Sequence, residues 1–137
     1  MQLSRGRWVA IGLLVLVVAL IGHGRTLVTE PVEVQRHYVD AVWLSVAAPG
    51  LVLLSALATP SFDFDRYTRD RGRNGVALDA MAIVLVCLFV ATGAATGLDS
   101  VGVGTTLLFG VLALVVYLTA FAVFTLRASD HYERWSA

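Results

Sequence analysis

Two histidines are the residues whose type and position could support metal chemistry: His23 and His37, each at the end of an apolar segment. Imidazole nitrogens ligate haem iron and copper, so two such rings at one membrane surface would suit a redox subunit. A simpler interpretation is an exposed pair between Glu33 and His37, which have i,i+4 spacing. No Met or Cys lies nearby to complete a copper site. We predict no metal or cofactor, and a haem- or copper-binding redox subunit using His23 and His37 is an alternative.

Two aspartates, Asp40 and Asp79, lie near the starts of apolar segments. Ionisable residues inside a membrane often mark function, but a carboxylate at a helix N-terminus also meets the positive end of the helix dipole. We therefore predict a cap or an ion pair at each, with Arg73 within reach of Asp79. The sequence contains no serine elbow, phosphate-binding glycine loop or H-E-x-x-H motif. We predict that the protein is not an enzyme and has no catalytic residues.

Four apolar runs must position these residues. The chain has 137 residues, of which 58% are hydrophobic, and a mean hydropathy of +0.78. A helix needs roughly 20 apolar residues to cross a bilayer, where backbone groups must be paired within the helix. The composition and the runs predict an all-α membrane protein, a four-transmembrane-helix bundle forming a single integral membrane domain. The spans are expected at about 8–22, 39–58, 76–96 and 103–126.

The arginines orient these spans. All ten basic residues are arginine. With four spans, only Arg25 and Arg36 fall on one side, and the other side should be cytoplasmic because it is rich in positive charge. We predict a multi-pass protein of the cell (inner) membrane with both the N- and C-termini cytoplasmic. The arginines that set this topology are Arg5, Arg7, Arg66, Arg69, Arg71, Arg73, Arg127 and Arg134.

The most charged stretch, "FDFDRYTRDRGRNG", belongs to a predicted charged cytoplasmic loop at 59–75. Its three aspartates nearly cancel its four arginines, so it lacks the basic excess of a nucleic-acid site, and we predict no nucleic-acid partner. The i,i+4 spacing of its acids and arginines allows a short salt-bridged helix. We expect His131 to be solvated and three aromatic residues to rest at the lipid interface, namely Phe62, Phe64 and Tyr67.

The first span has two interpretations. "MQLSRGR" followed by only fifteen apolar residues resembles a signal peptide. The run ends in "ALIGHGR" without an A-x-A cleavage site, and the arginine pattern fits four spans. These features favour a retained anchor, whereas a cleaved segment would leave three spans.

Small residues predict how the helices pack, because close approach of backbones drives helix association in lipid. Pro49 should kink the second span, since it cannot donate a helical hydrogen bond. The third span carries a G-x-x-x-G motif that could pack within the chain or against a copy. The packing candidates are Ala41, Ser45, Ala48, Ser55, Gly93, Gly97, Gly110 and Ala113.

These features predict a structural or accessory subunit that packs with a larger membrane complex or with itself. Its expected partners are the lipid bilayer and either another membrane protein or a second copy. An alternative is a small oligomeric transporter or channel. In that case the kink at Pro49 would act as a hinge, and neutral polar residues would line the path: Ser45, Ser55 and Tyr117.

Overall fold

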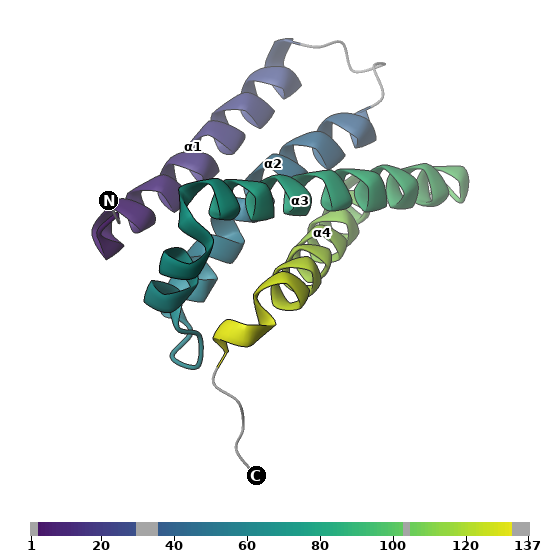
Figure 1. Cartoon of the computed structure of the whole chain (residues 1–137). Helices are drawn as coiled ribbons and strands as arrows, with labels where there is room; N and C mark the ends of the chain where they lie inside the picture. Colours follow the sequence, from purple (N-terminus) through teal and green to yellow (C-terminus); the bar gives the residue numbers. More distant parts are fainter. Residues whose placement is uncertain (1–2, 30–35, 103–104, 133–137) are drawn as a thin grey trace.

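The protein is all-helical in the part described by the computed structural model, residues 3–29, 36–102 and 105–132. Figure 1 shows the helices in chain order: α1 (Arg5–Thr29), α2 (Arg36–Ala58), α3 (Phe64–Ser100) and α4 (Thr105–Ala128), then a short 3₁₀-helix at Ser129–His131. Within these ranges, four helices are long and apolar enough to cross a membrane. The sequence prediction of an all-helical chain with four such helices is confirmed.

Helix α2 is the centre of the arrangement. It packs against α1, α3 and α4, and α3 and α4 also pack against each other. The backbone of α1 closely approaches no described helix other than α2, and Figure 1 shows α1 alongside α2, away from α4. Side chains add direct contacts from α1 to the α3–α4 hairpin, where the Trp8 ring packs against Phe64 and the His23 ring against Phe109.

The core combines small residues of α2 and α3 with larger residues of α4. The buried face of α2 contains three of the predicted packing residues, Ala41, Ser45 and Ala48, and Ser55 is half-buried. The small residues allow close approach, and the longer side chains of α4 fill the space between the helices. Along residues 73–100 of α3 the buried hydrophobic residues are Ile83, Cys87, Ala91 and Ala95, and those on α4 are Leu108, Leu112, Val116, Ala120, Phe124 and Ala128.

The other packing candidates lie away from this core. Gly93, Gly97 and Gly110 are exposed, and a Cβ added at any of them would meet nothing within 4 Å. Ala113 is half-buried. Within the described chain these glycines therefore form no tight helix contact, and their packing against a copy or a partner stays a prediction.

The close approach of α1 and α2 occurs at Gly12 and Gly50 instead. A Cβ on Gly50 would lie 2.9 Å from the carbonyl oxygen of Gly12 and 3.1 Å from Cγ1 of Val15. Helix α2 runs without a break through Pro49, immediately before this crossing. The kink predicted at Pro49 stays a prediction, because a continuous helix can still bend at a proline.

The variant Gly50→Ala is expected to lower the free energy of unfolding by about 2 kcal/mol, because overpacking typically costs roughly 1–3 kcal/mol and the obstructing atom is backbone. The matched control is Gly93→Ala, where the added methyl group meets open space. Denaturation by SDS in mixed micelles measures both. Equal effects of the two variants would contradict the tight crossing.

A sharp break interrupts α3 at Gly72, whose φ of 66° and ψ of 175° are not helical. A positive φ favours glycine, which has no Cβ to clash with the backbone. The break divides α3 into a short helical segment at 64–71 and a long helix at 73–100. The predicted loop at 59–75 is thus partly helical, and the short segment folds back over the end of the bundle (Figure 1).

Candidate functional site

The end of the bundle that carries most of the arginines is closed by a folded cap, defined here as residues 59–71 and 129–132. Phe62 and Tyr132 form an isolated antiparallel bridge, and the backbone N–H of Asp63 donates to the carbonyl oxygen of His131 at 2.8 Å. Arg66 donates to the carbonyl oxygen of Asp130. The cap therefore joins the segment after α2 to the segment after α4.

Aromatic rings fill the cap. Phe62 is the hub, with ring centroids 4.8 Å from Tyr132, 5.2 Å from Phe124 and 5.5 Å from Tyr67. Phe62, Phe64 and Tyr67 are all buried, so the prediction that they rest at the lipid interface is wrong. The aromatic residues in the segment "FDFDRY" were the sequence feature that could have indicated this cluster. They did not indicate that Phe124 and Tyr132 complete it.

His131 is also buried, although the sequence suggested a solvated tail. Its Nε2 lies 2.9 Å from Oδ2 of Asp70, and its ring packs edge-on against Tyr67 at 5.4 Å. The partner carboxylate and the aromatic neighbour lie more than sixty positions earlier in the chain. The tail is thus tied to the segment that precedes Gly72.

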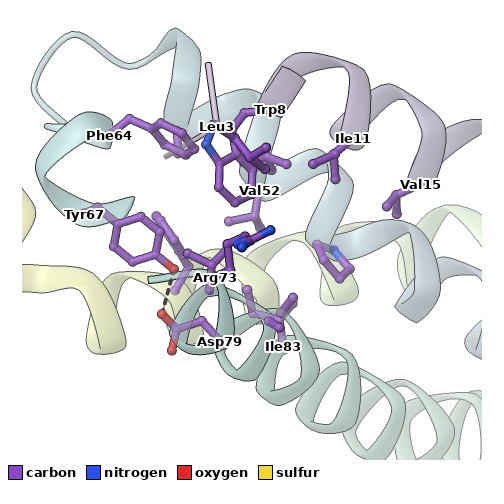
Figure 2. Close-up of a pocket in the computed structure, with 17 residues that line it drawn as sticks. Leu3, Trp8, Ile11, Val15, Val52, Phe64, Tyr67, Arg73, Asp79 and Ile83 are labelled. Carbon is purple, nitrogen blue, oxygen red and sulfur yellow. Dashed lines mark hydrogen bonds between the residues drawn. The ribbon is translucent and has the colours of Figure 1, made fainter. Parts of the chain in front are cut away.

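Asp79 is the most deeply buried ionisable residue at this end, with 1% of its surface exposed. Oη of Tyr67 donates to Oδ2 at 2.6 Å, as Figure 2 shows, and Nε of Arg127 donates to Oδ1 at 2.6 Å. Nε of Arg71 lies 3.4 Å from Oδ2 and its guanidinium also donates to the carbonyl oxygen of Arg127. We call these four residues the Asp79 network.

The sequence prediction that Asp79 forms an ion pair is confirmed, but the predicted partner is not the observed one. Arg73 was expected, whereas Arg71 and Arg127 supply the charges. Arg71 comes from the segment before the break at Gly72, which folds back toward Asp79. One buried carboxylate therefore links the cap, α3 and α4 by charge-assisted hydrogen bonds, which are stronger than neutral ones.

The Asp79 network suits a structural clamp better than acid–base chemistry. Both carboxylate oxygens already accept hydrogen bonds from described residues. A buried charge is costly unless it is paired and hydrogen-bonded, and here both conditions are met. Asp79 thus connects the closed cap to α4.

The variant Tyr67→Phe tests one contact of the clamp. It is expected to cost about 1.5–2 kcal/mol of unfolding free energy, because a hydrogen bond to a charged group contributes roughly 1.5–3 kcal/mol. Tyr117→Phe is the matched control, since Tyr117 is 40% exposed and packs on Phe121. SDS denaturation compares the two, and a neutral Tyr67→Phe would contradict the bond to Asp79.

A second polar pair lies at the opposite end of the bundle. Nε2 of His23 on α1 lies 2.6 Å from Oδ1 of Asp40 on α2, and Asp40 is buried. The His23 ring stacks on Phe109 of α4 at 5.8 Å. Asp40 was expected to cap a helix or form an ion pair, and it contacts His23. The metal alternative also needs His37, whose side chain lies outside the described residues.

Metal and transport chemistry gain no geometric support. Within the part of the chain that the structure describes, no group of three or more His, Cys, Asp or Glu residues could hold a metal ion. Ser45 is buried and donates to the carbonyl oxygen of Ala41 at 2.7 Å. Neither described cavity is lined by the residues expected along a transport path: Ser45, Ser55 and Tyr117.

Comparisons with protein-family models, with curated proteins and with solved structures find no match for this chain. Its function is therefore inferred from its own geometry. The buried carboxylates at the two ends, Asp79 and Asp40, are each held by partners within the chain. The outward faces of the helices remain the surfaces open to other molecules.

Proposed function

We propose that this chain is a multi-pass protein of the cell (inner) membrane, with four spans and both termini in the cytoplasm. The support is the distribution of charge over four apolar helices. Arg5 donates to the carbonyl oxygen of Leu57, so the start of α1 lies beside the end of α2, next to the cap. Positive charge marks the cytoplasmic side. The arginines at this end are Arg5, Arg7, Arg66, Arg69, Arg71, Arg73 and Arg127, and Arg134 lies outside the described residues.

Cysteine labelling tests this topology. The native Cys87 is fully buried, and replacing it with alanine gives a background for single cysteines. The sites are Asn74→Cys at the arginine-rich end and Gly24→Cys at the opposite end, both at exposed positions. A membrane-impermeant maleimide added to intact cells should label only the second. The opposite pattern would reverse the orientation, and labelling of both before lysis would contradict membrane sealing between them.

We infer further that the protein is a structural or accessory subunit. The observation that carries this proposal is the outward face of α3, where Phe89 is 82% exposed and Gly93 and Gly97 have open space above them. Glycine lowers helix stability by roughly 1 kcal/mol relative to alanine, and no internal neighbour uses the space it leaves. Small residues beside an aromatic ring suit close packing with a helix of another membrane protein or of a second copy.

The test is purification from the source membrane in mild detergent, using a C-terminal tag and mass spectrometry of what co-purifies. The intact protein should retain a stoichiometric membrane partner or a second copy, and the double variant Gly93→Leu, Gly97→Leu should lose it without a fall in melting temperature. Gly24→Leu is the control, because Gly24 on α1 also has open space. Recovery of the protein alone as a monomer would contradict the accessory role.

A further inference from the structure

A cleft of about 320 Å³ lies at the arginine-rich end of the bundle, between α1 and α3. Figure 2 shows Ile11 and Val15 on one side and Ile83 on the other, with Val52 of α2 between them. Because the backbones of α1 and α3 do not approach each other closely, the side chains between them leave this space partly open. Ligand pockets usually measure roughly 300–1,000 Å³, so the cleft is large enough for part of a ligand.

Two hydrogen-bond donors line this otherwise apolar cleft. Arg73 is exposed, and its guanidinium forms no ion pair with the described residues. The indole Nε1 of Trp8 is buried, with the residue 7% exposed, and has no hydrogen-bond partner among the described residues. Its aromatic neighbour Phe64, at 5.7 Å, offers only a weak π acceptor.

The one acidic residue that lines the cleft does not balance these donors. Asp79 already accepts hydrogen bonds from Tyr67 and Arg127. The cleft therefore combines an apolar wall with the positive charge of Arg73, which points to an amphipathic anion as its ligand.

We propose that the cleft binds an anionic phospholipid of the cytoplasmic leaflet, with an acyl chain along Ile11, Val52 and Ile83 and the phosphate at Arg73. This proposal rests on the membrane insertion and orientation proposed above, which place the cleft beside the anionic cytoplasmic leaflet. The positive charge of Arg73 favours an anionic lipid over a zwitterionic one. The apolar wall favours a lipid over a free phosphate.

The experiment titrates delipidated full-length protein in mild detergent with phosphatidylglycerol or phosphatidylcholine and counts bound lipid by native mass spectrometry. Phosphatidylglycerol should bind about fivefold more tightly, the preference expected of one arginine near an anionic headgroup. Arg73→Gln should reduce its affinity to that of phosphatidylcholine. Arg69→Gln is the matched control, because Arg69 is an exposed arginine of the cap that does not line the cleft.

A second variant fills the cleft while keeping its charge. Ala77 lines the cleft and is exposed, so Ala77→Trp should leave the melting temperature unchanged and reduce the binding of both lipids. Equal affinity for the two lipids, or equal losses in Arg73→Gln and Arg69→Gln, would overturn the proposal. If Ala77→Trp instead released a protein partner or a second copy and left lipid binding intact, the cleft would be a protein-binding site and the lipid proposal would be overturned.

The lipid titration does not depend on sidedness, because the protein is in detergent. A reversed labelling pattern for Asn74→Cys and Gly24→Cys would overturn the proposed orientation alone. Loss of lipid selectivity with the expected labelling pattern would overturn the lipid site alone. The two failures are therefore distinguishable.

Discussion

Replacing both Arg71 and Arg127 with glutamine is expected to lower the free energy of unfolding by about 3 kcal/mol, the low end of the usual cost of leaving a buried charge unpaired. Asp79 lies at the centre of this effect, because its side chain is 2% exposed whereas those of Arg71 and Arg127 are 32% and 41% exposed. Solvent screening of the two guanidinium groups places the cost at the low end. The double variant leaves a buried carboxylate with only Tyr67 as a partner.

Each single variant should lose much less than half of the unfolding free energy that the double variant loses. The reason is that either arginine can partly neutralise the carboxylate when the other is absent. Arg127→Gln should have the larger effect, since its Nε lies 2.6 Å from Asp79 and that of Arg71 lies 3.4 Å away. SDS denaturation in mixed micelles, followed by circular dichroism, measures all three variants. The matched control is the pair Arg69→Gln and Arg73→Gln, which removes the same charge from exposed positions.

A rescue experiment identifies the cause. Adding Asp79→Asn to the double arginine variant removes the unpaired charge while keeping the shape of the side chain, so it should recover about 1–2 kcal/mol of the loss. A triple variant as unstable as the double one would show that the arginines stabilise the cap by packing and not by pairing with Asp79. The order of stability therefore distinguishes electrostatic from steric roles.

The helices themselves were predictable from the sequence because their apolar runs are long enough to span a bilayer and are separated by charged or turn residues. The buried face of α2 could also be predicted, since its small residues repeat at helical spacing and Ala41, Ser45 and Ala48 are buried. The buried face of α4 could not be predicted. This helix is apolar all round, so periodicity gives no direction, and the small-residue rule selected Gly110 although Leu112 and Val116 form the contact.

The cap and the Asp79 network could not be read from the sequence because both depend on contacts distant in the chain. The bond between Arg127 and Asp79 spans 48 positions, and Phe62 pairs with Tyr132 across a still longer interval. The break at Gly72 decides that Arg71 and not Arg73 faces Asp79. An i,i+4 pattern in a charged loop reports only local helix formation.

Phe62→Ala is expected to lower the free energy of unfolding by about 3–4 kcal/mol, within the range of roughly 3–5 kcal/mol for removing a buried phenylalanine. Phe62 is 5% exposed and contacts rings from the segment before Gly72, from α4 and from the chain after it. No single neighbour can move to fill the space, because each is fixed by a different element.

The matched control is Phe89→Ala, which removes the same ring from an 82% exposed position on α3 and should change the free energy of unfolding by less than about 0.5 kcal/mol. The two sites differ in solvent as well as in burial. Under the proposed topology the charged cap lies in water, so Phe62 leaves water when the cap folds and the hydrophobic effect contributes in full. Phe89 faces outward from α3, and under the proposed membrane insertion lipid surrounds its ring before and after the helices pack. SDS denaturation of both variants therefore measures whether the cap folds as an aqueous domain, and equal losses would contradict that assignment.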